Sequence, residues 1–238
     1  MLAHKLRRVR TSGPLTYVGG YATSWLGQTT DKVVSLTSLT GGTDSAPQAG
    51  DIVIAAFARA NQYNLAALLI SGYTEIAQDT SGDSEGELAL LVAYKFMGGS
   101  PDTTITLPTT NSTAAAGAVC ISVWRNANPT TPLDVAAASA SGANSAIPNP
   151  PTITPATAGC VIFACGGAGH IRGTATFSSS DLTNFLTVGG NDTNDISLGL
   201  GTKTNWTSGA FDPAAFTFSA SNSTAYAWTA ITFVLRTA

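Results

Sequence analysis

The chain repeats itself, and this repetition limits the folds that it can adopt more than any other feature of the sequence. Residues 111–125 align without a gap with residues 222–236, and seven of the fifteen positions are identical. Three further pairs of segments match upstream, in the same order and 108 or 109 residues apart: 49–53 with 158–162, 73–76 with 182–185, and Lys95 with Lys203. Four matches at nearly constant separation predict two diverged copies of one unit of roughly 100 residues.

Each copy is predicted to consist of β-strands. Apolar segments of strand length, bounded by Gly, Pro, Asn and Asp, recur along the chain: residues 33–39, 51–58, 87–96, 103–107, 119–124, 160–165, 216–218 and 226–235. The one stretch with helical spacing, residues 61–70, is stopped early by Gly72. A β unit of roughly 100 residues has the usual size of a β-sandwich or jelly roll.

The predicted fold is therefore all-β: two tandem, duplicated jelly-roll-like β-sandwich units preceded by an extended N-terminal arm. The arm covers residues 1–30, the first unit residues 31–146 and the second unit residues 147–238. Four prolines in residues 144–155 mark the connection, because proline removes a backbone donor and disfavours a central strand. The sequence leaves open whether the copies form separate sandwiches or one merged sandwich.

Composition narrows the class of protein further. Charged residues make up 11% of the 238 residues, against about 25% in an ordinary soluble domain, and Ala, Thr, Gly and Ser together make up about half of the chain. Long coiled coils and disordered chains both need more charge. No apolar run is long enough for a transmembrane helix, and no apolar region follows the basic N-terminus as in a secretory signal. Cys120, Cys160 and Cys165 lie in apolar segments and are expected to be buried free thiols.

The sequence holds few residues from which a catalytic site could be built. His4 and His170 are its two histidines, too few for a histidine metal site, and no nucleophile motif accompanies either one. Asp79, Asp83 and Glu85 cluster before an expected strand, where a solvated hairpin loop is the simpler interpretation. Their alternate spacing also resembles the start of a calcium loop, so a divalent cation is the one cofactor that the sequence leaves open. We therefore expect no catalytic residues and no enzyme activity.

The first ten residues carry the one clear charge asymmetry. Lys5, Arg7, Arg8 and Arg10 are four of the eleven basic residues, which leaves the rest of the chain acidic. Such an arm can bind nucleic acid, dock on an acidic protein surface or remain a solvated tail. Four charges without interleaved aromatics make a small footprint for nucleic acid, so docking on a protein assembly is favoured.

Aromatic side chains are the remaining candidates for ligand contact, because sugar rings stack on them. Trp124 and Trp228 fall in or beside expected strands of the matched segments, where core packing accounts for them. Tyr63 and Trp206 fall in polar, loop-like contexts. These two residues are the candidates for contact with a glycan.

Four segments resemble a family of bacteriophage virion proteins of the tail, fibre and capsid-appendage type: residues 49–54 (AGDIVI), 72–75 (GYTE), 94–95 (YK) and 123–135 (VWRNANPTTPLDV). The similarity spans roughly residues 33–236 and rests on strand starts and turn residues. The resemblance implies a non-enzymatic β-sandwich component of the particle, made in the host cytoplasm without a signal. It carries no catalytic residue over and identifies no position on the particle.

Together these observations predict a structural component of a bacteriophage virion that docks through its basic arm on other virion proteins. Closed symmetry is the rule for such assemblies, so further copies of this chain are expected as partners, with a trimer as the working expectation. The alternative is a carbohydrate-binding module that recognises host surface glycans. Neither a membrane nor nucleic acid is an expected partner. The tail, the fibre, the collar and the capsid surface stay open as its place on the particle.

Overall fold

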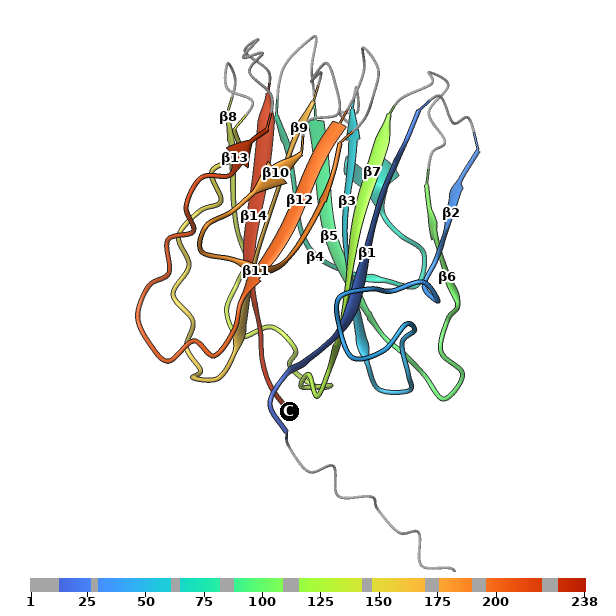
Figure 1. Ribbon diagram of the computed structural model, residues 1–238, viewed down its shortest axis with the longest axis vertical. Helices are drawn as coiled ribbons and strands as arrows, with labels where there is room; N and C mark the ends of the chain where they lie inside the picture. Colours follow the sequence, from blue (N-terminus) through green and yellow to red (C-terminus); the bar gives the residue numbers. More distant parts are fainter. Residues whose placement is uncertain are drawn as a thin grey trace, which may run out of the picture.

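The computed structural model describes residues 13–26, 30–60, 65–81, 88–108, 116–142, 147–169, 176–189, 196–219 and 227–238. In these ranges the protein is all-β, with antiparallel strands and a single 3-10 turn, η1 (Leu65–Leu68). Within the same ranges no helix is long and apolar enough to cross a membrane. Two five-stranded sheets face each other and form a β-sandwich (Figure 1).

The first large sheet has the strand order β1–β7–β3–β5–β4. The bounds of its strands are β1 (Thr16–Trp25), β7 (Gly117–Arg125), β3 (Ile52–Ala60), β5 (Leu88–Phe96) and β4 (Thr74–Ser81). The central strands β7, β3 and β5 are buried over most of their length, because both faces of the sheet are covered. Their sequences are accordingly continuous apolar runs and do not alternate with polar residues.

The second large sheet has the strand order β11–β12–β9–β14–β8. The bounds of its strands are β11 (Thr183–Val188), β12 (Ile196–Lys203), β9 (Val161–Gly169), β14 (Trp228–Leu235) and β8 (Ala138–Gly142). Its central strands β12, β9 and β14 are buried in the same way. The edge strands β8 and β11 are partly exposed.

A two-stranded sheet covers the outer face of each large sheet. β2 (Lys32–Ser35) pairs with β6 (Thr104–Leu107), and β10 (Phe177–Ser178) pairs with β13 (Thr217–Phe218). Val34 and Ile105 pack with the outer face of the first large sheet, and Phe177 packs with that of the second. The molecule is therefore built from four layers of sheet, which enclose three hydrophobic cores.

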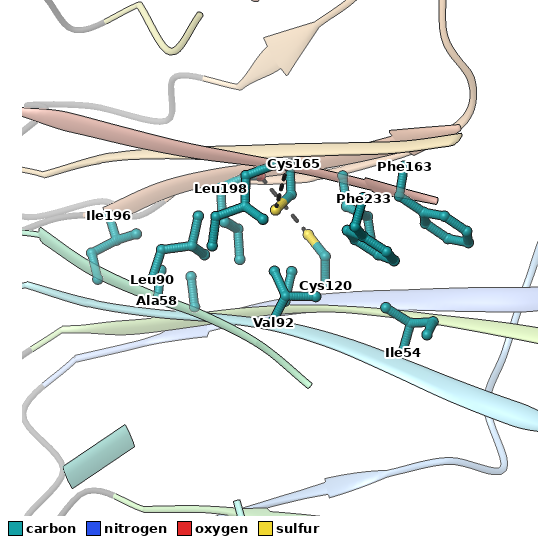
Figure 2. Close-up of a cluster of buried hydrophobic side chains, with 14 of the residues drawn as sticks. Ile54, Ala58, Leu90, Val92, Cys120, Phe163, Cys165, Ile196, Leu198 and Phe233 are labelled. Atoms are coloured by element: carbon teal, nitrogen blue, oxygen red, sulfur yellow. Dashed lines mark hydrogen bonds between the residues drawn. The ribbon is translucent and has the colours of Figure 1, made fainter. Parts of the chain in front are cut away.

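The largest core lies between the two large sheets. Figure 2 shows Ile54 and Val92 of the first sheet facing Phe163 and Phe233 of the second. The rings of Phe163 and Phe233 are stacked with their centroids 4.6 Å apart. Trp124 of the first sheet reaches across the sandwich to within 5.6 Å of the Phe163 ring. This shared core joins the two halves of the chain into one packed body.

The two large sheets have the same strand order. Read from matching edges, β1–β7–β3–β5–β4 corresponds to β8–β14–β9–β12–β11, whereas β10 of the second small sheet follows β9 in the chain and β2 of the first small sheet precedes β3. The three central pairs of corresponding strands begin at nearly constant separations: 109 residues for β3 and β9, 108 for β5 and β12, and 111 for β7 and β14. The edge strands β1 and β8 begin 122 residues apart. Across the sandwich β1 lies opposite β11, and β4 lies opposite β8. Such reciprocal contacts are those of a two-fold relation between the sheets.

The structure supports the predicted strands and adds others. Each of the eight apolar segments overlaps an observed strand, and the described part of the segment with helical spacing forms only the turn η1. All three cysteines are buried and free, as expected. The strands that were missed are polar, short or rich in glycine: β1, β4, β8, β10, β11 and β12. Such sequences lack the apolar pattern by which a strand is recognised.

Two predicted boundaries are corrected by the strand pairing. Residues 16–25, assigned to the N-terminal arm, form the edge strand β1, which pairs with β7. β8, assigned to the first unit, pairs with β14 in the second large sheet. Each half thus contributes one five-stranded and one two-stranded sheet. β1 is interrupted by two glycines and β8 consists of small residues, so neither sequence indicates a partner and only the pairing reveals it.

Candidate functional site: the docking end of the sandwich

The start of the described chain and its C-terminal residues lie together at one end of the sandwich (Figure 1). The hydroxyl of Thr237 donates a hydrogen bond to the carbonyl of Gly13 at 3.0 Å, and the side-chain amide of Asn126 donates one to the carbonyl of Pro14 at 3.0 Å. The backbone N–H of Ala238 donates to the carbonyl of Asn126 at 2.9 Å. We call this end, defined by Gly13, Asn126 and Thr237, the docking end.

Asn126 gives the docking end its local geometry. It follows β7 directly and has a φ of 68°, in the left-handed region. Asparagine tolerates this conformation better than most residues because its short side chain bonds locally. The turn brings the Asn126 side chain to Pro14 and its carbonyl to Ala238. One residue thereby ties both ends of the described chain to β7.

The last residue of β7, Arg125, forms an ion-pair cluster with two carboxylates. Its Nε donates to Oδ1 of Asp51 at 2.8 Å and its Nη2 to Oδ2 at 3.0 Å, and Nη2 also donates to Asp44 at 3.1 Å. Asp51 is 1% exposed and also accepts the backbone N–H of Gln48. The hydrogen bonds to Asp51 raise the pKa of Arg125 above its ordinary value, although burial opposes them. Bidentate pairs of this kind fix orientation as well as charge.

A second cluster forms at the end of β14 in the other half. Nε and Nη2 of Arg236 donate to Oδ1 of Asp134 at 3.1 and 3.0 Å. Oδ2 of Asp134 accepts the backbone N–H groups of Ala156 and Thr157 at 2.6 and 3.0 Å. Burial by itself raises the pKa of Asp134, but the hydrogen bonds from Thr157, Ala156 and Arg236 outweigh it and leave the pKa below its ordinary value. Asp134 thereby ties the segment before β8 to the segment before β9.

Ion pairs and hydrogen bonds hold the chain segments of the docking end in place. Both arginines are paired with carboxylates, and both ends of the described chain are hydrogen-bonded to the sheets. Across the ranges that the structure describes, no three His, Cys, Asp or Glu side chains come close enough together to hold a metal ion. The arrangement can position a segment that precedes Gly13.

The residues predicted from the sequence are placed only in part. Seven of them lie outside the described residues: Lys5, Arg7, Arg8, Arg10, Tyr63, Asp83 and Glu85. Asp79 is partly buried in β4, where its carboxylate accepts the backbone N–H of Thr80 at 2.8 Å. The predicted cation site and basic arm therefore stay predictions.

Trp206 follows β12 and lies on the outer side of the second sheet. Its indole N–H donates to the carbonyl of Gly209 at 3.1 Å, and its ring lies 5.3 Å from that of Phe211 at an angle of 58°. Its carbonyl accepts the N–H of Gly159, just before β9. The ring is half-buried and packs against the core on the outer face of the second large sheet. Contact with a glycan stays a prediction for this residue.

The arginines of the two ion-pair clusters could have been recognised from the sequence, but their carboxylate partners could not. Arg125 and Arg236 are identical positions of the matched segments, and Asp51 and Asp134 lie in the segments that carry the family resemblance. Nothing in the sequence pairs an arginine with a carboxylate 74 or 102 residues away. Only the folded sheets bring these groups together.

The comparisons with known proteins add no identification. No family model, no curated protein and no solved structure matches the chain.

Proposed function

We propose that the protein is a non-enzymatic structural component of a bacteriophage particle, docked through the basic arm formed by Lys5, Arg7, Arg8 and Arg10. Its place would be the tail, a fibre, the collar or the capsid surface. The partners would be other virion proteins and further copies of this chain, with a closed symmetric assembly as the expected form. The family resemblance of residues 33–236 is the starting point of the proposal.

One observation supports this proposal above the others. Gly13, to which the arm is joined, is held at the docking end by Thr237 and is followed by β1 of the first large sheet. An arm that precedes Gly13 would be joined to the packed sandwich at a hydrogen-bonded point, as docking through that arm requires. The low charge of the chain also fits permanent packing, because few charges have to be desolvated on assembly.

We also infer that the two halves descend from one duplicated unit of jelly-roll type. The sequence matches, the common strand order and the reciprocal facing of β1 with β11 and β4 with β8 support this inference. Within the first half the pairs are nested, β1 with β7, β2 with β6 and β3 with β5, as in a jelly roll. The second half differs because β10, which pairs with β13, follows β9 in the chain, so the pairs β9 with β12 and β10 with β13 are not nested.

Neutralising the arm tests the docking proposal. Exchanging Lys5, Arg7, Arg8 and Arg10 for Gln should reduce the copy number in purified particles at least about tenfold, because the attraction to an acidic surface is lost. The matched control exchanges Lys5→Arg and the three arginines for Lys, and it should be incorporated normally. Thermal unfolding should be the same for both variants, since the described contacts begin at Gly13. Normal incorporation of the Gln variant would contradict the proposal.

A further inference from the structure

Arg59 is buried on the outer face of the first large sheet without a hydrogen-bond partner. The residue is 0% exposed, and none of its three guanidinium nitrogens meets an acceptor among the residues that the structure describes. It follows Phe57 on the same face of β3, beneath the core that β2–β6 covers. Burying a guanidinium without a partner is strongly unfavourable. A buried arginine that has no hydrogen-bond partner indicates that an anion could bind to its guanidinium group.

Small residues surround Arg59 on both sides in the sheet. Its cross-strand partners are Ala89 on β5 and Gly117 on β7. The ring of Trp25 occupies the space above Gly117, where an added Cβ would collide with it. The same ring stacks on Phe57 with centroids 6.0 Å apart. The strand register therefore places the Trp25 indole beside the Arg59 guanidinium.

The indole adds a second unpaired donor. Nε1 of Trp25 is buried and, like the guanidinium of Arg59, finds no acceptor among the described residues. Burial lowers the pKa of Arg59, while the negative charge of Asp31 opposes that shift without a hydrogen bond to the guanidinium. Two kinds of N–H donor thus lie near each other without a hydrogen-bonded acceptor among the described residues.

We propose that Arg59 and Trp25 form a binding site for a single carboxylate group. The planar guanidinium matches the two oxygens of a carboxylate, and the indole N–H can donate to one of them. The charge of Lys32, whose Nζ lies 5.9 Å from the centroid of the Trp25 ring, offsets that of Asp31, so one carboxylate balances the remaining charge of Arg59. A phosphate dianion would leave net negative charge in a buried place near Asp31, so the carboxylate is the better match.

The site lies close to an edge of the first large sheet. Trp25 is 7% exposed. It is the last residue of the edge strand β1, and the next residue, Leu26, is 40% exposed. The site therefore lies beneath the last residue of an edge strand of the first large sheet. The site is independent of the basic arm and goes beyond the proposed docking function.

Substitution Arg59→Met provides the first test, because it keeps the length of the side chain and removes the charge. Without a carboxylate the variant should unfold at the same temperature as the wild type or higher, since the unpaired charge is gone. Titration with sodium acetate at pH 7 and constant ionic strength should raise the unfolding temperature of the wild type with saturation and leave the variant unchanged. A variant that is strongly destabilised without acetate would overturn the proposal, because Arg59 would then have a partner within the chain.

Further arms of the titration identify the source and the chemistry of the group. Trp25→Phe keeps a ring over Gly117 but removes the indole N–H, and it should bind acetate about tenfold more weakly. A blocked Gly-Glu-Gly peptide reports whether the acidic side chain of a protein can reach the site; binding of acetate alone would assign the site to small free acids. Equal responses of wild type and Arg59→Met, or an Arg59-dependent preference for inorganic phosphate over acetate, would overturn the proposal.

Discussion

At one equivalent position both large sheets contain a tryptophan paired with a glycine, but the two residues are exchanged between the strands. In the first sheet Trp25 on the edge strand β1 pairs with Gly117 on β7. In the second sheet Trp228 on β14 pairs with Gly142 on the edge strand β8. In both cases the indole lies where a Cβ of the glycine would be. At this position each sheet has one tryptophan ring packed over a glycine of the neighbouring strand. The tryptophan can come from either of the two strands.

Other equivalent positions differ in charge. Arg59 on β3 corresponds to Ala168 on β9, which is buried and apolar. Asp51, which precedes β3, corresponds to Cys160, which precedes β9. The carboxylate that holds the arginine in the second half comes instead from Asp134, before β8. The two halves have the same strand order in their large sheets, but their buried charged residues occupy different positions.

The largest expected difference between the halves concerns the two carboxylates. Asp134→Ala should lower the free energy of unfolding by about 2–4 kcal/mol, because Arg236 and two backbone N–H groups lose their acceptor. Asp51→Ala should cost about 1–2 kcal/mol, because Arg125 keeps Asp44. Urea unfolding measures both values. Equal losses would mean that Asp44 gives Arg125 no support.

The exchanged Trp and Gly pairs predict a smaller difference. Gly117→Ala should cost about 1–3 kcal/mol, because the Trp25 ring is held by Phe57 and cannot move freely. Gly142→Ala should cost less than about 1 kcal/mol, because Trp228 is half-buried, at the end of its strand, and can shift outward. Thermal unfolding of the two variants tests the order. A larger loss for Gly142→Ala would contradict the assignment of Trp25 as the more confined ring.

The smallest expected effect is the pH dependence of stability that arises from Cys120 and Cys165. Each half contributes one of these cysteines to the core between the two large sheets. Burial raises the pKa of Cys165 to about 12 and that of Cys120 well above its ordinary range. Between the ordinary thiol pKa of about 8.5 and these values, the unfolded chain releases protons that the folded chain keeps, so stability falls as the pH rises. Each thiol should account for about 1 kcal/mol by pH 9.5.

Cys120→Ala and Cys165→Ala should each remove one thiol's share of this dependence, which urea unfolding between pH 8 and pH 10 can measure. Figure 2 shows both sulfur atoms between the large sheets. Equal changes of slope are expected, since both residues are 0% exposed. A variant whose slope equals that of the wild type would show that its thiol is exposed to solvent in the folded protein.

The sequence predicted the apolar strands well and the polar ones poorly. Central strands such as β3 and β9 are long apolar runs, and their pattern is visible without any partner. β8, with the sequence ASASG, has no such pattern and becomes a strand because β14 supplies backbone partners. At the candidate site the sequence marked Arg125 and Arg236 as repeated positions, but it could not name their carboxylates. Arg59 was missed because it directly follows the predicted segment 51–58, and nothing in the sequence indicates that a charged residue at this position is buried.

The sequence by itself determined that this protein is all-β and poor in charge, and it predicted an internal duplication, because strand pattern, composition and self-similarity can be recognised without knowledge of the fold. The tertiary structure decided how the two halves are combined. The two large sheets pack face to face around Trp124, Phe163 and Phe233, and the former boundary strands β1 and β8 join the sheets as edges. Burial and pairing depend on groups about a hundred residues apart. For that reason only the folded chain shows that Arg59 is buried without an acceptor and that Asp134 is held by four hydrogen bonds.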